Sequence, residues 1–163
     1  MVAGSLLAWM TASGAAAAPG PGDVPPPGLG QTYEGDDVRL PDYAGKAVIV
    51  TFWASWCAYC LKELPILDAV QSRAGKGQMA VIAVNIEKRD VFRRAARLLR
   101  DAVHFELVND ARGTAQQAFG VNGIPHMVII GRDGHILNVY RGYSEKNLDA
   151  IVADVNQALA PLP

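Results

Sequence analysis

Two cysteines, Cys57 and Cys60, are the residues of this chain whose type and spacing best suit chemistry. They occur in the run Trp56-Cys57-Ala58-Tyr59-Cys60, which follows an apolar, strand-like segment and opens a helix-like one. Side chains at positions i and i+3 of a helix lie on one face, close enough for two cysteines to form a disulfide. Unpaired N–H groups and partial positive charge at a helix start stabilise a thiolate there. The pattern therefore predicts a nucleophilic Cys57 and a resolving Cys60 that releases a mixed disulfide.

Three other uses of the cysteine pair fit the sequence less well. A structural cross-link over so short a loop would restrict the unfolded chain by only about 2 kcal/mol, against roughly 5 kcal/mol for a hundred-residue loop. A zinc site would need further ligands, and the three histidines are not arranged as a metal-ligand pair. Covalent haem attachment needs a histidine directly after the second cysteine, where this chain has Leu61. We therefore expect no metal and no cofactor other than the redox-active disulfide.

The segments around the cysteines predict an α/β domain. Two apolar runs, residues 47–53 and 79–85, are typical of strands covered on both faces, and the helix-like segment 57–73 lies between them. Strand, helix and strand in this order predict a parallel pair joined by a right-handed crossover. Near the end of the chain, a turn signal at residues 131–134 predicts an antiparallel hairpin. The hairpin strands are expected at residues 126–130 and 135–141, a further strand at 104–108, and helices at 90–103, 114–119 and 144–160, the last capped by Ser144.

Length and charge exclude several classes of protein. The chain has 163 residues, of which 50% are hydrophobic and 19% charged, which suits one domain with its own core and excludes a wholly disordered chain. The formal net charge of −1 gives no electrostatic case for a nucleic-acid partner, and we expect a monomer. Four arginines, at positions 89, 93, 97 and 100, form a stripe that either docks an acidic partner or is solvated.

The first thirty residues differ from the rest in composition. Residues 1–18 hold no charged side chain and end in alanines, as in the apolar and cleavage regions of a secretory signal, although its basic start is missing. An uncleaved membrane anchor is the alternative, for which eighteen residues are marginal. Residues 19–30 hold five prolines and four glycines, which predicts a solvated spacer. We expect the folded domain to cover residues 31–163 and to be periplasmic or secreted.

The run VTFWASWCAYCLKELP, residues 50–65, resembles the thioredoxin superfamily and, within it, the exported TlpA/ResA-like (DsbE/CcmG-type) thiol-disulfide oxidoreductases. The resemblance extends over about residues 40–159 and includes Gly123-Ile124-Pro125 before a strand. It implies a thioredoxin-like fold, in which a central mixed sheet with a parallel strand–helix–strand unit and a C-terminal antiparallel hairpin is flanked by helices. It also implies that Pro125 is cis and faces the cysteines. Trp56, Tyr59 and Ile124 would then form an apolar rim that contacts the substrate.

Three further positions compare unevenly with that family. Glu63 matches the glutamate of its CxxCxxExP pattern and, one helical turn from Cys60, could tune the proton affinity of that thiol; a solvated glutamate is the alternative. Thr51 stands where thioredoxin itself has a buried aspartate, which argues against a cytosolic thioredoxin. His126 stands where the family usually has threonine, and we count it among the substrate contacts. It either stabilises a thiolate when protonated or points away from the cysteines.

These features predict an enzyme that exchanges dithiol for disulfide with protein substrates. The resemblance implies a reducing role in the periplasm, recharged by a membrane thiol-reductant transporter, for example in cytochrome c maturation or metal-site assembly. The residues alone leave the direction open, because exchange is reversible and follows the difference in reduction potential. Two other functions remain open: a copper(I) metallochaperone, because soft thiolates select that ion, and a thiol peroxidase, whose PxxxTxxC context is absent from VTFWASWC.

Overall fold

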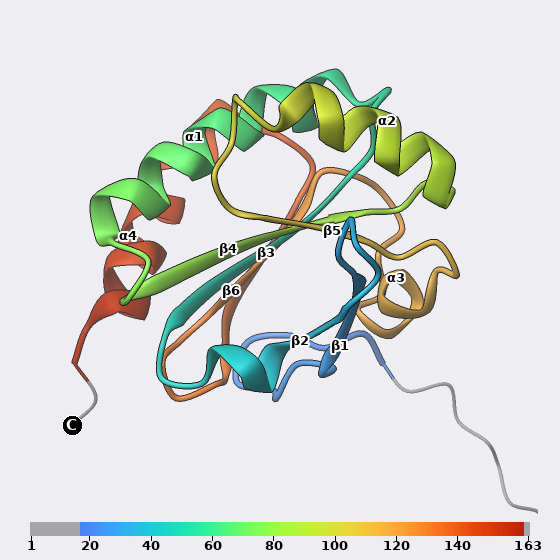
Figure 1. Cartoon of the computed structure of the whole chain (residues 1–163). Coiled ribbons are helices and arrows are strands. Elements are labelled where there is room, and N and C mark those ends of the chain that lie inside the picture. The colour runs from blue at the N-terminus through green and yellow to red at the C-terminus, as the bar shows by residue number, and fades with distance from the viewer. Residues whose placement is uncertain (1–16, 162–163) are drawn as a thin grey trace, which may run out of the picture.

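A computed structural model describes residues 17–161, so nearly all of the expected signal segment at residues 1–18 lies outside the described residues. A mixed seven-stranded sheet with the order β2-β1-β5-β4-β3-β6-β7 forms its centre, and helices cover both faces (Figure 1). The strands are β1 (Gly28–Gln31), β2 (Asp37–Arg39), β3 (Ala47–Trp53), β4 (Met79–Asn85), β5 (Glu106–Asn109), β6 (His126–Ile130) and β7 (Ile136–Arg141). The α-helices are α1 (Ala58–Ala74), α2 (Arg89–Leu99), α3 (Thr114–Ala118) and α4 (Leu148–Leu159), and Leu40–Tyr43 and Glu145–Asn147 are short 3₁₀ helices.

The strands in the middle of the sheet have the predicted directions. Strands β3 and β4 are parallel over their full length, from Ala47 opposite Met79 to Trp53 opposite Asn85, with α1 as the crossover. Strand β6 runs antiparallel to β3, and β7 runs antiparallel to β6. The expected mixed sheet, with its parallel strand–helix–strand unit and C-terminal hairpin, is therefore confirmed. The carboxyl ends of β3 and β4 lie side by side, where the chain turns from β3 into α1.

The last helix begins later than the sequence indicates. Helix α4 begins at Leu148, and the three residues before it form a 3₁₀ helix. In the part of the chain that the structure describes, Ser144 precedes this 3₁₀ helix without a side-chain capping bond. The prediction of Ser144 as the cap of an α-helix is wrong, because a tighter i→i+3 turn occupies the helix entry. Within residues 17–161, no helix combines the length and apolar composition needed to cross a bilayer.

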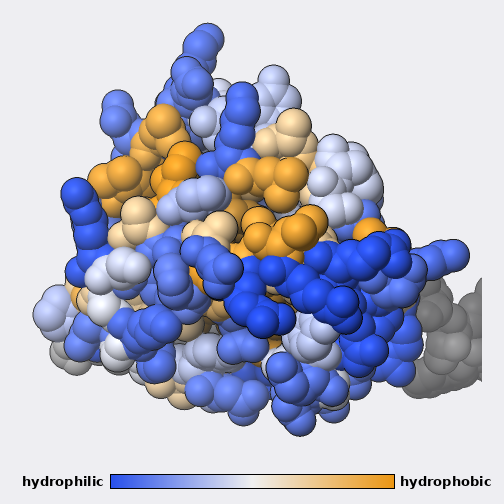
Figure 2. Space-filling model, turned by 45° about the horizontal axis from the view of Figure 1, so that its top comes forward, coloured by the Kyte–Doolittle hydropathy of each residue, from blue (hydrophilic) through white to orange (hydrophobic). Residues whose placement is uncertain are grey.

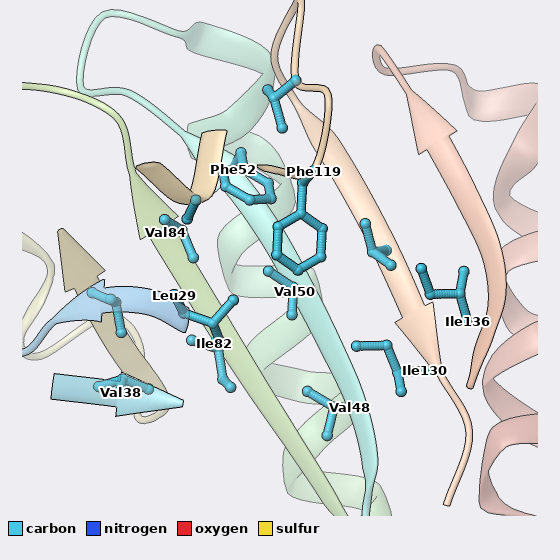
Figure 3. Packing of buried hydrophobic residues seen from close by; sticks show 14 residues of the cluster. Leu29, Val38, Val48, Val50, Phe52, Ile82, Val84, Phe119, Ile130 and Ile136 are labelled. Atoms are coloured by element: carbon cyan, nitrogen blue, oxygen red, sulfur yellow. The ribbon is translucent and has the colours of Figure 1, made fainter. Parts of the chain in front are cut away.

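Apolar side chains cover the sheet on both faces because the central strands are buried throughout. On one face they pack against α1, α2 and α4, and this layer includes both cysteines. On the other face, Phe52 packs against Phe119 beside α3, with ring centroids 5.4 Å apart, and Leu29 and Val38 extend this layer from β1 and β2 (Figure 3). The disulfide region is thus attached to a sheet that is fixed from both sides.

The prediction that residues 19–30 form a solvated spacer is wrong for much of this segment. The N–H of Gly22 donates to the carbonyl of Ile136 at 2.8 Å, and the N–H of Ile136 donates to the carbonyl of Asp23 at 2.9 Å. Leu29 in β1 is fully buried in the core. Proline fixes φ at a value that extended backbone accepts, so a proline-rich run can lie along the sheet even where it cannot join an interior strand.

Gly30 shows how closely this segment approaches the sheet. Its φ is +124°, and a Cβ atom there would lie 2.4 Å from the carbonyl oxygen of Asn109 in β5. Residues with side chains rarely adopt this φ, and here backbone would block the space as well. Glycine is therefore required where β1 meets β5.

The arginine stripe on α2 partly holds the loop after β1. Arg89 donates to the carbonyl oxygens of Thr32 and Tyr33 at 2.6 and 3.0 Å. Arg97 donates to the Tyr33 hydroxyl at 2.9 Å, and the Arg93 guanidinium lies 5.7 Å from the Tyr33 ring centroid. Three of the four arginines thus contact residues of this chain, which neither sequence-based interpretation of the stripe included.

Two alanine substitutions test the role of the N-terminal segment. Leu29 is fully buried, whereas Val24 in the same segment is 71% exposed. We expect Leu29→Ala to lower the free energy of unfolding by about 3 kcal/mol through lost burial and a cavity, and Val24→Ala by less than about 0.5 kcal/mol. Urea denaturation of the oxidised protein measures both. If the two variants were equally stable, residues 19–30 would be a spacer after all.

Candidate active site

The cysteines lie where a buried strand gives way to a helix. Strand β3 ends at Trp53, the N–H of Cys57 donates to the carbonyl of Ala54 at 3.1 Å, and α1 begins at Ala58. Cys57 is the N-cap residue of α1, and its sulfur accepts a hydrogen bond from the N–H of Cys60 at 3.2 Å. A thiolate at Cys57 would meet the same N–H and the positive end of the helix, which lowers the pKa of a thiol.

Cys57 and Cys60 are joined by a disulfide, with their Cα atoms 5.2 Å apart. Cys57 is 7% exposed and Cys60 is 1% exposed, so the sulfur at the helix start is the more accessible one. This order fits attack by an external thiol at Cys57 and an internal role for Cys60. The assignment of nucleophile and resolving thiol stays a prediction that the geometry favours.

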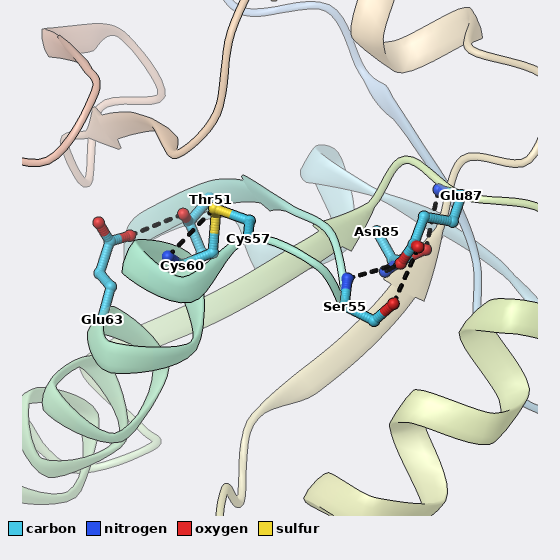
Figure 4. Close-up of a disulfide and its surroundings, with 7 residues drawn as sticks. All are labelled: Thr51, Ser55, Cys57, Cys60, Glu63, Asn85 and Glu87. Carbon is cyan, nitrogen blue, oxygen red and sulfur yellow. Dashed lines mark hydrogen bonds between the residues drawn. A yellow bond between two sulfur atoms is a disulfide. The ribbon is translucent and has the colours of Figure 1, made fainter.

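Glu63 enters the interior beside the disulfide. Its side chain is buried, and its Oε1 accepts a hydrogen bond from the Thr51 hydroxyl at 2.8 Å, which links α1 to β3 (Figure 4). Burial raises the pKa of Glu63 above its ordinary value, and the Thr51 hydrogen bond opposes this in part. The alternative of a solvated glutamate is therefore wrong. The effect of Glu63 on the proton affinity of the Cys60 thiol stays a prediction.

The residues expected to contact substrate are divided between surface and core. Trp56 and Tyr59 are 70% and 57% exposed, and the Tyr59 ring stacks on Tyr143 with centroids 5.3 Å apart. Ile124 is half-buried against the apolar cluster that contains both cysteines, and its peptide bond to Pro125 is cis, as the resemblance implies. Ile124 thus lies against the cluster that contains the disulfide, and Trp56 and Tyr59 expose their rings next to the cysteines in the chain. Their role as a substrate-contacting rim stays a prediction.

His126 does not belong to this surface. It is fully buried in β6 opposite Phe52 of β3, and the two rings pack edge to face with centroids 5.9 Å apart. Opposite residues on paired strands share one face of a sheet, so His126 lies with Phe52 on the face away from α1. The prediction of His126 as a substrate contact is wrong, because strand alternation directs it into the core.

The environment of His126 also disfavours its charged form. Burial, together with the nearby positive charge of Arg141, lowers the pKa of His126 to about 4. Its Nε2 has no hydrogen-bond partner among the described residues. The ring is neutral at neutral pH, so the geometry favours the interpretation in which His126 points away from the cysteines.

An apolar pocket opens between α1, α4 and the ends of β6 and β7. Glu63 and Pro125 line it together with Tyr143, and apolar side chains of α1 and α4, among them Ile66 and Val152, form its walls. Figure 2 shows apolar side chains gathered on the side that carries α1 and α2, next to a strongly hydrophilic area. Glu63, one helical turn after Cys60, thus lines a pocket that can accept apolar groups.

A polar cluster on the other side of the disulfide was missed from the sequence. Glu87, just after β4, accepts hydrogen bonds from the backbone N–H and the hydroxyl of Ser55 at 2.6 and 2.9 Å, and Asn85 donates to the same carboxylate at 3.0 Å (Figure 4). The signal available in the sequence was the polar pair Asn85 and Glu87 at the end of a predicted parallel strand. Tyr143 was also missed, and nothing in its local sequence indicated its stacking on Tyr59.

Metal ligands do not assemble in the part of the chain that the structure describes. Within residues 17–161, no three His, Cys, Asp or Glu side chains lie close enough together to hold a metal ion. The expectation that the site uses no metal and no cofactor other than its disulfide stays a prediction.

Comparisons with known proteins support the thioredoxin-like fold. The model of the AhpC/TSA family matches residues 21–139. The thiol-disulfide oxidoreductase ResA of Geobacillus thermodenitrificans (strain NG80-2) is 30% identical over 115 residues, which are 69% of this chain and 64% of that protein, less than two thirds of its length. The sporulation thiol-disulfide oxidoreductase A of Bacillus subtilis (strain 168) is 26% identical over 133 residues, 80% of this chain and 79% of that protein.

Solved structures extend the likeness to the whole fold. The crystal structure of a candidate thiol:disulfide interchange protein DsbE from Chlorobium tepidum superposes with a TM-score of 0.77 at 28% identity, over 88% of this chain and all of that one. The exposed lipoprotein thioredoxin of Streptococcus pneumoniae strain TIGR4 superposes with a TM-score of 0.67 at 29% identity, over 80% of this chain and 97% of that one. The expected thioredoxin-like fold is confirmed.

The buried His126 makes a specific prediction for stability against pH. With a pKa of about 4 in the folded protein and about 6.5 when unfolded, the unfolded chain binds a proton between these values that the folded one does not. The free energy of unfolding should therefore fall by about 3 kcal/mol between pH 7 and pH 4 through this residue alone.

Urea denaturation of the wild type and His126→Thr across this range isolates the effect, because the stability difference between them should change with pH. His135→Thr, on the surface, controls for the loss of a histidine. Parallel curves for the wild type and His126→Thr would mean that His126 is protonated as easily in the folded protein as in the unfolded one.

Proposed function

The chain belongs to the AhpC/TSA family, and from this premise we propose that it is a thiol-disulfide oxidoreductase that exchanges its Cys57–Cys60 disulfide with protein cysteines. One observation carries the proposal. The more exposed cysteine caps the start of α1 and accepts a helix N–H, while its disulfide partner lies one turn deeper. The names of ResA, the sporulation protein and the DsbE protein support the same activity.

The reductive half-reaction uses both sulfurs. The Cys57 thiolate attacks one sulfur of a substrate disulfide, the substrate S–S bond breaks, and the other substrate sulfur leaves as a thiolate that takes a proton. Cys60 then loses its proton and attacks the Cys57 sulfur. The mixed disulfide breaks, the second substrate thiolate leaves and is protonated, and Cys57–Cys60 is oxidised. Two electrons and two protons pass to the substrate.

Glu63 suits the proton transfer at Cys60. It lies one helical turn from Cys60, is buried, and has a pKa raised by that burial. A carboxylate in this position can accept the Cys60 proton as the thiol becomes a nucleophile. Thr51 holds the carboxylate through its 2.8 Å hydrogen bond. We assign Glu63 the proton-accepting role in the resolving step.

We expect the residues around Cys57 to contact the substrate. Trp56, Tyr59 and Ile124 offer apolar and aromatic surface around the disulfide, and the cis Pro125 lines the adjoining apolar pocket. A protein segment that presents a cysteine next to apolar residues would fit this surface. We propose protein thiols and disulfides as the substrate class.

The cellular setting that we propose is extracytoplasmic. Residues 1–18 would direct export or anchor the protein, and the printed name of the pneumococcal neighbour, an exposed lipoprotein thioredoxin, supports this setting. The protein would act there as a monomeric reductant, recharged by a membrane thiol-reductant transporter. Cytochrome c maturation and metal-site assembly are the processes in which such a reductant would serve.

Trapping of substrates tests the proposed function. A Cys60→Ala variant expressed in the native compartment cannot resolve mixed disulfides, so partners should accumulate on Cys57 and be released by dithiothreitol. Cys57→Ala, expressed at the same level, is the matched control and should trap none. The identity and redox state of the trapped proteins would give substrate class and direction together.

Three results would contradict the proposal. These are the absence of thiol-dependent adducts, steady turnover of hydrogen peroxide by the purified protein, or stoichiometric copper(I) binding by the reduced form with no exchange activity. The second result would indicate a thiol peroxidase and the third a metallochaperone.

Glu63 makes a second prediction. A buried carboxylate beside Cys60 disfavours the Cys60 thiolate, so Glu63→Gln should lower the pKa of that thiol by roughly one unit. Titration of the reduced Cys57→Ala protein, in which Cys60 is the remaining thiol, measures this pKa by thiolate absorbance. Glu145→Gln, on the 3₁₀ helix before α4, is the surface control. An unchanged Cys60 pKa in Glu63→Gln would remove the proton-accepting role.

A further inference from the structure

We propose that Glu87 is a positioning residue for the nucleophile, holding the chain before Cys57 so that the Cys57 sulfur meets the start of α1. This inference rests on the proposed function, because it concerns the reactivity of the same sulfur. Glu87 lies thirty residues after Cys57 in sequence, yet its carboxylate contacts Ser55, two residues before the nucleophile.

The sheet brings Glu87 to this place. Asn85, the last residue of β4, lies opposite Trp53, the last residue of β3, and the N–H of Ile86 donates to the Trp53 carbonyl at 3.1 Å. The two chains therefore leave the sheet side by side. One continues through Ser55 toward Cys57, and the other turns at Glu87 toward α2.

The carboxylate holds Ser55 at two atoms. Its Oε2 accepts the Ser55 backbone N–H at 2.6 Å, and its Oε1 accepts the Ser55 hydroxyl at 2.9 Å (Figure 4). A carboxylate that accepts two hydrogen bonds from one residue restricts both the position and the orientation of that residue, and charge-assisted bonds are stronger than neutral ones. Ser55 is thus fixed in the short segment between β3 and α1.

Glu87 is itself held by side chains of two strands. Asn85 donates to Oε2 at 3.0 Å and accepts the Glu87 backbone N–H at 2.9 Å. Asn109, at the end of β5, donates to the Glu87 carbonyl at 2.8 Å. Both asparagines are buried. They therefore hold the Glu87 carboxylate in the position that contacts Ser55 before a substrate binds.

The consequence for Cys57 follows from its place as the N-cap. Its sulfur lies 3.2 Å from the Cys60 backbone nitrogen, and this contact requires that the segment from Ala54 to Trp56 keep its backbone conformation. If that segment shifts, a thiolate at Cys57 loses a donor and the alignment with the helix end. The thiol pKa then rises, and the fraction of reactive thiolate at neutral pH falls.

The geometry separates this role from a plain effect of charge. Glutamine in place of Glu87 can keep all three hydrogen bonds, because its oxygen can take the place of Oε2 and accept from Ser55 N–H and Asn85. Its NH₂ can take the place of Oε1 and donate to the Ser55 hydroxyl oxygen. Positioning is thus kept while the negative charge is removed. A role through charge would instead make Cys57 more acidic in Glu87→Gln, because a nearby anion is lost.

The test measures the reaction of Cys57 with Ellman's reagent between pH 4 and pH 10, in the Cys60→Ala background so that one thiol reports. We expect Glu87→Gln to stay within about twofold of its parent in rate and to keep its thiol pKa. We expect Glu87→Ala to raise the Cys57 pKa by about one unit and to react about fivefold more slowly at pH 7, because less of the thiol is ionised there. Ser55→Ala, which loses one hydrogen bond of the set, should fall between the two.

A control separates positioning from loss of stability. Gln71→Ala breaks a buried hydrogen bond to the Val81 N–H, 2.7 Å long, on the same strand β4, and should leave the rate and the pKa of Cys57 unchanged. If Glu87→Ala matched Glu87→Gln, or if both lowered the Cys57 pKa, the positioning role would be overturned. Ellman's reagent is a small disulfide that needs no protein partner, so this result is independent of the trapping experiment that tests the proposed function.

Discussion

The hydrogen bond from the Cys60 N–H to the Cys57 sulfur requires a helix to begin directly beyond the end of a buried strand. The rest of the structure meets this requirement. Strand β3 is held between β4 and β6, with apolar layers on both faces, so its end cannot drift. Helix α1 packs back onto the same sheet and keeps its first turn over that end. Cys57, the more exposed of the two cysteines, therefore faces the positive end of the helix dipole and an amide group that are already in place.

Two pairs of polar side chains lie on either side of the disulfide, and each is held by specific hydrogen bonds. Glu63 and Thr51 form one buried pair beside Cys60, and Glu87 with Ser55 forms another set before Cys57. Glu63 is buried and Glu87 is half-buried, and each carboxylate is hydrogen-bonded, which offsets the cost of removing it from water. His126 is the contrasting case, since it is polar and buried but lies on the opposite face, where its charged form is disfavoured.

Much of the fold and the core of the site could be predicted from local patterns. Continuous apolar runs located β3 and β4 to the residue, and the spacing of Cys57 and Cys60 indicated their pairing. Features that depend on distant strands could not be found this way. Leu29 joins the core although its neighbours are prolines and glycines, because its burial comes from pairing with β2 and packing on the sheet. The face occupied by His126 and the contact of Glu87 with Ser55 both follow from strand register, which composition does not encode.

The claim that the helix start activates Cys57 can be measured directly in the reduced wild-type protein. Alkylation with iodoacetamide across pH 4 to 10, with the labelled cysteine identified by peptide mass spectrometry, gives a rate profile for each thiol. The account predicts that Cys57 is labelled first, with a pKa well below the ordinary thiol value of about 8.5, while Cys60 stays protected. Equal labelling of both cysteines near that value, or earlier labelling of Cys60, would contradict it.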